Sequence, residues 1–332
     1  MAKDKKKMKF YKNQDKLIEM YEETLSGAPQ EDNEKTQRHA SILAKVILLL
    51  NLMLLIAKVV AAAMSGSMSI VAAVVDSAVD LVSGILIWWS NRAMQKSSKY
   101  RYPQGRTRLE PISIIILSVI MAVASVLVIK ESIEQIVNLA KSAGGGPRME
   151  VSTIVICVVT IVTKFVLFIL CYRIKSPSTQ VLGQDQRNDV ISNTVALAGG
   201  FIGARWWKFA DPIGALIISL YIIIGWVLTG KEHIKQLSGH VADPAVITRV
   251  TWVSMNFDPK IQALETVRVY HVGTNFLAEV HLVLPGSMTL KQGHDIGEGL
   301  QMKLEEFPDI ERAFVHVDYE TEHRPENEHK AL

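Results

Sequence analysis

The fold of this chain is decided by residues 74–81, which read VVDSAVDL inside a long apolar run. This stretch places two carboxylates, Asp76 and Asp80, four residues apart, and on an α-helix that spacing puts both on one face, one turn apart. A second pair with the same spacing, Asp185 and Asp189, stands in the sequence GQDQRND and begins another apolar run. Charges at membrane depth are costly and usually mark an ion or proton pathway. The sequence therefore predicts one site at which two helices bring four aspartates together.

Six apolar segments are long enough to cross a bilayer, which takes about 20 residues in a helix. Hydrophobic residues make up 49% of the 332-residue chain. The six predicted spans are residues 40–64, 68–94, 109–137, 151–172, 180–203 and 212–230. The second and fifth spans are the least apolar, and these two carry the aspartates. A spanning helix tolerates polar residues where they face a cavity lined by protein, so we expect a six-helix transmembrane bundle at residues 39–235.

Lysine and arginine gather on one side of the predicted spans. They fill the tail before the first span, the second-to-third and fourth-to-fifth connections, and the stretch after the sixth span, whereas the opposite side holds little beyond Lys141, Arg148, Arg205 and Lys208. The positive-inside rule then places both termini in the cytoplasm. Residues 1–38 are predicted to form a polar cytosolic tail, a disordered arm or one with a short helix at 14–25. The net charge of +3 gives no indication of nucleic-acid binding.

After residue 235 the composition changes to that of a soluble domain. Alternating apolar and polar residues predict strands, turn residues separate them, and Asp243 is a suitable N-cap for the first helix. The predicted elements are a helix at 243–256, strands at 264–270 and 276–284, a helix at 290–307 and a strand at 313–319. This helix–strand–strand–helix–strand order predicts a small α+β domain at 236–323, followed by a polar tail at 324–332.

The paired aspartates have a structural alternative, in which each caps a neighbour or pairs with a basic residue. Basic partners look scarce, because Lys58, Lys130 and Lys164 lie on other segments and only Arg187 lies within the second pair. Four close carboxylates cannot all stay ionised in a low-dielectric site without a counter-charge. A divalent cation supplies that charge, and protons must partly replace it when it leaves. The two pairs therefore predict exchange of a metal ion for protons.

The ligand types bear on the identity of the metal. All four predicted ligands are hard oxygen donors, and none of them is His or Cys. Oxygen-rich sites suit Mn, Mg and Ca, whereas imidazole and thiolate favour Zn and Cu. Calcium prefers about six to eight oxygen ligands, and Mg gives up its water reluctantly. We therefore expect Mn(II), with ferrous iron as an alternative.

These residues resemble the cation diffusion facilitator family, and its manganese group in particular. Residues 76–84, DSAVDLVSG, are similar to the family's second-helix metal motif, and residues 185–193, DQRNDVISN, to its fifth-helix motif. The stretch YPQGRTRLEP at 102–111 is similar to the entry into the third helix, and the end of the chain resembles plant and fungal metal tolerance proteins. Zinc members usually carry His at the position of Asp185, where Asp is typical of the manganese group. Many manganese members have His in place of Gln186, a departure that removes no predicted ligand.

The resemblance implies a six-helix membrane domain in a lipid bilayer, a cytosolic ferredoxin-like domain and a homodimer. It implies a secondary active transporter and not an enzyme, with no cofactor. The implied activity is export of Mn(II), with Zn(II) or Fe(II) as alternative substrates, from the cytosol into an organelle lumen or out of the cell. Inward movement of protons drives this export by alternating access. Plant and fungal relatives commonly lie in Golgi or vacuolar membranes.

The resemblance also implies a second metal site in the cytosolic domain. Bacterial relatives bind metal roughly where this chain has Glu265, His281, His316 and Asp318, and His294 is a further candidate. The alternative is that these are ordinary solvent-facing strand residues.

Two other classes of function compete with transport. An intramembrane transferase would use paired aspartates to hold a metal and a diphosphate, but it would also need basic phosphate ligands, and only Arg187 is near in sequence. A metal sensor or scaffold would bind metal without flux. For dimerisation, the third span offers small residues that allow close contact with a partner helix or with the helices of its own bundle. These are Ser113, Ser118, Ala122 and Ser125.

Overall fold

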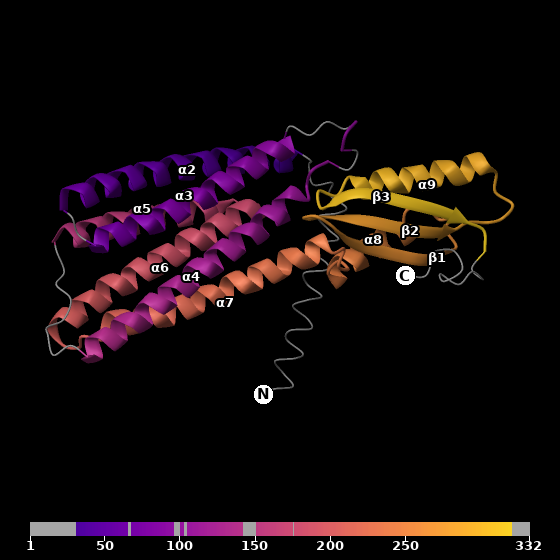
Figure 1. The fold of residues 1–332 in the computed structure, drawn as a ribbon. Helices are drawn as coiled ribbons and strands as arrows, with labels where there is room; N and C mark the ends of the chain where they lie inside the picture. Colours follow the sequence, from indigo (N-terminus) through magenta and orange to yellow (C-terminus); the bar gives the residue numbers. More distant parts are fainter. Residues whose placement is uncertain are drawn as a thin grey trace. The chain divides into compact units, whose positions relative to one another are not determined.

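The computed structural model describes residues 31–65, 68–95, 100–102, 105–141, 151–174 and 176–320 (Figure 1). The chain divides into two compact units, and the boundary falls between residues 235 and 236. The helix considered at 14–25 and the polar tail at 324–332 lie outside the described residues.

Within the described residues, the first unit consists of six long helices that lie side by side (Figure 1). Their bounds are α2 (Glu31–Ser65), α3 (Met68–Gln95), α4 (Leu109–Lys141), α5 (Val151–Arg173), α6 (Pro177–Arg205) and α7 (Ala210–Leu237). α2 begins inside the stretch that we predicted as a polar tail. Its first residues include Glu, Lys and Gln, which are good helix formers, and the apolar span behind them supplies a stable helix to extend.

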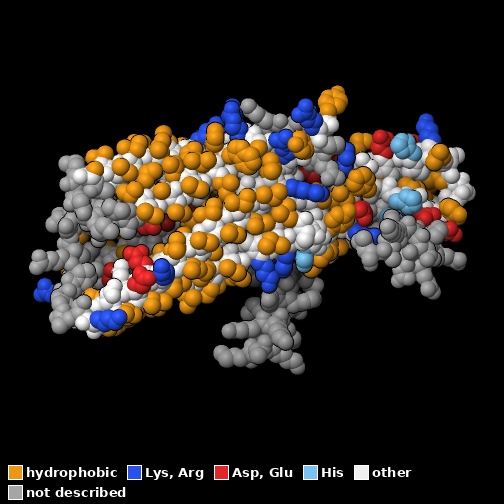
Figure 2. Space-filling model, in the orientation of Figure 1, with side chains coloured by type: hydrophobic (Ala, Val, Ile, Leu, Met, Phe, Trp, Pro, Cys, Tyr) orange, Lys and Arg blue, Asp and Glu red, His pale blue; other side chains and the backbone are white. Residues whose placement is uncertain are grey.

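Four of these helices are long and apolar enough to cross a membrane, over Arg38–Val60, Leu109–Lys141, Ile154–Arg173 and Ala210–Leu237. Figure 2 shows hydrophobic side chains covering the visible face of the helical unit, a surface that suits lipid better than water. α3 and α6, which carry the aspartates, are not among the four. They have 28 and 29 residues, which is enough length for a span. That all six helices cross the membrane stays a prediction.

The interior of the bundle is apolar where the helices meet. Its most deeply buried side chains, each less than 2% exposed, include Ile47, Ile87, Ile114, Leu117, Leu167, Leu182 and Trp226. On α4, the hydroxyl groups of Ser113, Ser118 and Ser125 donate to the carbonyl oxygens four residues earlier on the same helix. These serines are buried in this chain, and a Cβ at Gly230 of α7 would lie 3.3 Å from the Ser118 Cβ. These serines therefore pack against the helices of their own bundle. Of the two alternatives for this span, a partner helix or its own bundle, the structure has the second.

The second unit is a small α+β domain with the predicted order of elements. It contains α8 (Pro244–Met255), β1 (Ala263–Val272), β2 (Asn275–Val283), α9 (Leu290–Glu305) and β3 (Ile310–Asp318). β1 and β2 pair antiparallel through a turn at Gly273, whose φ of 74° favours glycine. β3 lies parallel to β2, and the connection between them runs through α9. The core, with Val250, Val280 and Leu300 at 0% exposure, joins both helices to one face of the sheet.

Candidate metal centre

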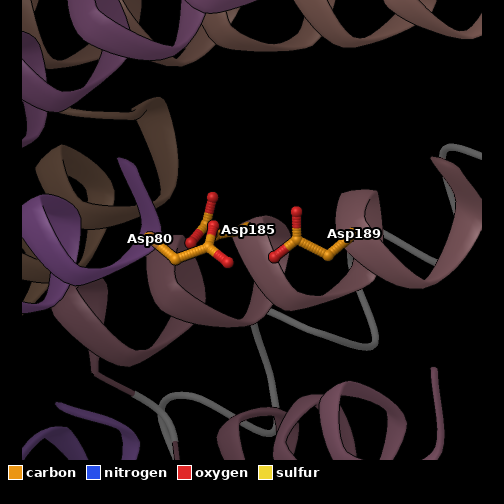
Figure 3. A group of neighbouring side chains, drawn as sticks. All are labelled: Asp80, Asp185 and Asp189. Atoms are coloured by element: carbon orange, nitrogen blue, oxygen red, sulfur yellow. The ribbon is translucent and has the colours of Figure 1, made fainter. Parts of the chain in front are cut away.

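Three of the four predicted aspartates meet inside the helical unit. The carboxylates of Asp80, Asp185 and Asp189 offer oxygen atoms that all lie within 4.8 Å of one another. Figure 3 shows Asp80 reaching from α3 toward Asp185 and Asp189, which lie on successive turns of α6. Two helices that are distant in sequence thus supply one group of carboxylates.

This group lies near the middle of both helices. Asp80 and Asp189 each stand twelve residues after the first residue of their helix, Met68 in α3 and Pro177 in α6. At the usual rise per residue, that is about 18 Å from the helix end. In a chain that crosses a bilayer, such a position is deep in the hydrocarbon layer, where ionisable groups face the inside of the bundle and mark an ion path.

Asp185 is the most enclosed of the three. It is 0% exposed, and Ser83 Oγ donates to Asp185 Oδ2 at 3.4 Å. Among the described residues, Asp185 Oδ1 has no hydrogen-bond partner. A buried carboxylate oxygen without a partner is costly, so this atom suits a ligand role. Gln186, at which the chain departs from many manganese relatives, is also fully buried, and its two amide atoms lack hydrogen-bond partners in the described part of the chain.

A lysine from a third helix reaches into the group. Lys164 of α5 is 1% exposed, and its Nζ lies 2.7 Å from Asp80 Oδ2 and 2.6 Å from Asp189 Oδ2. The expectation that basic residues lie away from the aspartates is therefore wrong. It failed because the short connection between α5 and α6 makes them neighbours, but nothing in the sequence shows which face of α5 meets the aspartates. A lysine in the middle of an apolar segment was the available signal, since such a residue needs a buried partner.

Asp76 lies outside the three-carboxylate group, but it lines a cavity that Asp80 and Asp189 also line. The cavity has a volume of about 250 Å³, and residues from α2 to α7 line it. They include Lys58, Asp76, Asp80, Ser125, Thr160, Lys164, Asp189, Asn193 and Ser219. The Lys58 Nζ donates to Ser77 Oγ at 2.8 Å, on the turn that also carries Asp76. Two lysines and three of the predicted ligands therefore share one cavity.

In the cytosolic domain, the sheet brings together four of the five residues of the second predicted site. His281 of β2 is paired with His316 of β3, and their ring centroids are 4.9 Å apart. Glu265 Oε2 lies 3.9 Å from His281 Nδ1, and Asp318 Oδ2 lies 3.9 Å from His316 Nε2. His294 is elsewhere, on α9, where its Nε2 is 3.7 Å from Glu298 Oε2.

Most of this cytosolic cluster is enclosed. The side chains of Glu265, His281 and Asp318 are 8%, 11% and 10% exposed, whereas that of His316 is 60% exposed. A register shift between Leu264 and Thr266 places Glu265 in a bulge of β1, and bulges re-aim side chains. Three of the four residues are therefore not ordinary solvent-facing strand residues.

Comparison with known proteins covers both units. Residues 44–238 match the family described as the cation efflux transmembrane domain, and residues 242–320 match the cation efflux protein cytoplasmic domain. The chain is 37% identical over 343 residues to metal tolerance protein 7 of Oryza sativa subsp. japonica, covering 99% of this chain and 86% of the relative. It is 34% identical over 335 residues to metal tolerance protein 10 of Arabidopsis thaliana, covering 98% of this chain and 78% of that relative. Among solved structures, the metal-bound C-terminal domain of the CzcD transporter from Thermotoga maritima is similar. The alignment covers 22% of this chain and 87% of the CzcD domain, at 23% identity and a TM-score of 0.21.

These matches decide between the classes of function that the sequence left open. Lys58 and Lys164 would supply the basic groups that a transferase needs, but members of the matched family are transporters and not enzymes. The relatives are metal tolerance proteins along almost the whole of this chain. The chain therefore belongs to the cation efflux family, also called the cation diffusion facilitators, and is a multi-pass membrane transporter of divalent metal ions.

Proposed function

We propose that this chain exports Mn(II) from the cytosol in exchange for protons. The transport site consists of Asp76, Asp80, Asp185 and Asp189, and α3 and α6 expose it to the two sides of the membrane in turn. The observation that carries the proposal is the convergence of Asp80, Asp185 and Asp189 from these two helices to within 4.8 Å. Asp76 lines the same cavity one turn along α3, within reach of a small rearrangement of that helix.

The donors around the cavity support Mn(II) as the main substrate. Carboxylate, hydroxyl and amide oxygens line it, and its described lining contains no His or Cys. Oxygen donors suit Mn(II), whereas zinc sites usually include imidazole or thiolate. Zn(II) and Fe(II) are the alternative substrates, because ligand type biases the affinity of a site without excluding other divalent ions.

The charges of the site support coupling to protons. Three carboxylates within 4.8 Å repel one another, and Lys164 offsets part of that repulsion. When the divalent ion leaves, the carboxylates lose their main counter-charge, and protons are the cations that replace it from water. If the site can open to either side of the membrane both when it holds protons and when it holds the metal ion, the protein exchanges the metal ion for protons.

The direct test is metal uptake by proteoliposomes with an acidic interior. We expect Mn(II) to accumulate while the pH gradient lasts, and Asp80→Ala to abolish the uptake. Glu134→Ala is the matched control, because this carboxylate on α4 is 62% exposed and pairs with Lys130 at 3.6 Å. Uptake of Zn(II) and Fe(II) measured in the same vesicles ranks the substrates. Unchanged uptake by Asp80→Ala, or uptake that ignores the pH gradient, would contradict the proposal.

We also propose that Glu265, His281, His316 and Asp318 bind a second divalent ion in the cytosolic domain. The support is the meeting of two imidazoles and two carboxylates across three strands. In full-length protein that carries Asp80→Ala, one Mn(II) should still bind per chain, and adding His281→Ala should remove it. His294→Ala is the control. Binding that survives His281→Ala would rule this site out.

We propose a homodimer in a Golgi or vacuolar membrane, with both termini cytosolic. The match to the cation efflux cytoplasmic domain supports the dimer, and the distribution of Lys and Arg supports the orientation. Chemical crosslinking in membranes should give a dimer, and a protease added to intact vesicles should remove the cytosolic domain. Monomers alone, or a protected C-terminal domain, would overturn these assignments.

A further inference from the structure

The position of Lys164 is that of a cation bound between two carboxylates. Its ammonium group lies 2.7 Å from Asp80 Oδ2 and 2.6 Å from Asp189 Oδ2, and these two residues come from different helices. The lysine itself comes from a third helix, α5, which carries no Asp or Glu. At 1% exposure, the side chain is fully enclosed by the bundle. One ammonium thus links α3, α5 and α6 through the two carboxylates that a transported ion would use.

A divalent ion and this ammonium cannot both hold the same two carboxylates closely. Metal ligation places oxygen atoms about 2.0–2.2 Å from the ion. The ammonium already occupies hydrogen-bonding positions on one oxygen of each carboxylate. Two cations on the same two carboxylates, even on different oxygen atoms, would lie close together and repel each other. Metal entry therefore requires the ammonium to withdraw.

The surroundings allow that withdrawal. A lysine ammonium sits on a flexible four-carbon stem, and Lys164 lines the cavity of about 250 Å³. Thr160, one turn earlier on α5, and Asn193 of α6 line the same cavity and offer polar contacts. The ammonium can therefore leave the carboxylates and remain solvated inside the bundle.

We propose that Lys164 is a tethered cation that competes with the transported ion. It holds Asp80 and Asp189 while the site is empty, withdraws when the metal binds, and returns to displace the metal on release. This inference rests on the proposed transport function. Its physical consequence is that the site binds metal more weakly than the carboxylates alone would, and releases it faster.

The test compares Mn(II) binding and transport by full-length protein with Lys164 charged and neutral, in a His281→Ala background that removes the second proposed metal site. Lys164→Met keeps the length of the side chain, and Lys164→Gln keeps an N–H donor. We expect both variants to bind Mn(II) at least tenfold more tightly, and to show a lower KM together with a lower kcat in proteoliposomes. Lys58→Met separates the effect of charge from direct competition, because this second lysine lines the same cavity but donates to Ser77 and not to a carboxylate. Its gain in affinity for Mn(II) should be at least threefold smaller than that of Lys164→Met.

Each alternative outcome has a clear meaning. If Lys164 only holds the helices together, both neutral variants bind Mn(II) more weakly than the wild type, and the inference is overturned. An equal gain in Lys58→Met shows that general charge and not direct competition sets the affinity, which also overturns it. Wild-type binding that Asp80→Ala does not reduce would instead overturn the proposed transport site itself.

Discussion

Replacing Asp185 with Asn should stabilise the metal-free protein while it removes metal binding at the transport site. Asp185 has two carboxylate neighbours within 4.8 Å, and its Oδ1 has no hydrogen-bond partner among the described residues. Lys164 makes its close ion pairs with Asp80 and Asp189 instead. The Asp185 charge is therefore repelled by two neighbours and held by no close ion pair of this kind.

The size of the effect follows from Coulomb's law. At an effective dielectric constant of about 20, two unit charges about 5 Å apart repel by roughly 3 kcal/mol, so the two neighbours together contribute roughly 7 kcal/mol of repulsion before other effects are counted. Attraction to Lys164, relaxation of the site and uptake of protons by the metal-free carboxylates reduce this figure, and we expect about 1–3 kcal/mol to remain. Ser83 can still donate to the amide oxygen of Asn, because it donates to Asp185 Oδ2 at 3.4 Å in the wild type.

The assay is thermal unfolding in detergent, followed by tryptophan fluorescence, with EDTA and with Mn(II); every chain compared, the wild type included, carries His281→Ala so that the second proposed metal site does not contribute. Without metal, Asp185→Asn should melt several degrees above the wild type. With Mn(II) at about 100 times its Kd, the wild type should gain about 2.7 kcal/mol and Asp185→Asn nothing. Asp189→Asn is the matched control, because it breaks the 2.6 Å ion pair with Lys164 and should melt below the wild type in EDTA. The reasoning is refuted if Asp185→Asn melts below the wild type without metal, or if Mn(II) still stabilises it.

Two further predictions concern other parts of the chain. Gly199→Ala should destabilise the helical unit by about 1–3 kcal/mol, because its Cβ would lie 2.9 Å from the backbone Cα of Asp211. Gly225→Ala should leave the melting temperature unchanged or raise it slightly, because its Cβ would meet only a side-chain atom, at 3.6 Å, and Ala is the better helix former. In the cytosolic domain, partial burial and a hydrogen bond to Glu279 raise the pKa of Tyr270 to about 12. The folded state then holds a proton that the unfolded state has lost, so stability falls as pH rises from about 10 to about 12. Tyr270→Phe should remove this fall in a pH series of melting curves, and a fall of the same size in the variant would assign it to other groups.

The sequence was sufficient for the fold because each element carries its own local signal. Long apolar runs predicted the six helices of the first unit, and alternation along 264–270 and 276–284 predicted β1 and β2. The length of an apolar run and the period of its apolar residues decide whether a segment is a helix or a strand, and neither depends on contacts with distant parts of the chain.

The candidate site was predictable only in part, because its geometry depends on how helices pack. The four-residue spacing places both members of each pair on one face, but it also separates them by about 6 Å along the axis. Asp80 of α3 faces both Asp185 and Asp189, whereas Asp76 is one turn farther away and lies outside the close group. Lys58 and Lys164 were missed for the same reason, since periodicity does not show which helix faces which.

The serines of α4 bear on how the bundle could move. Ser113, Ser118, Ser125 and Ser132 each direct the hydroxyl to the carbonyl four residues earlier in their own helix. None of these hydrogen bonds joins α4 to a neighbouring helix. If α4 slides or tilts past its neighbours, these four bonds travel with it intact. Hydrogen bonds to neighbouring segments lie near its ends, where Ser178 of α6 donates to Glu110 and Lys208 donates to the Leu139 carbonyl oxygen. The cost of moving its middle part lies in dispersion contacts that re-form at the new position, so the centre of α4 is suited to a structure that has to rearrange in every cycle.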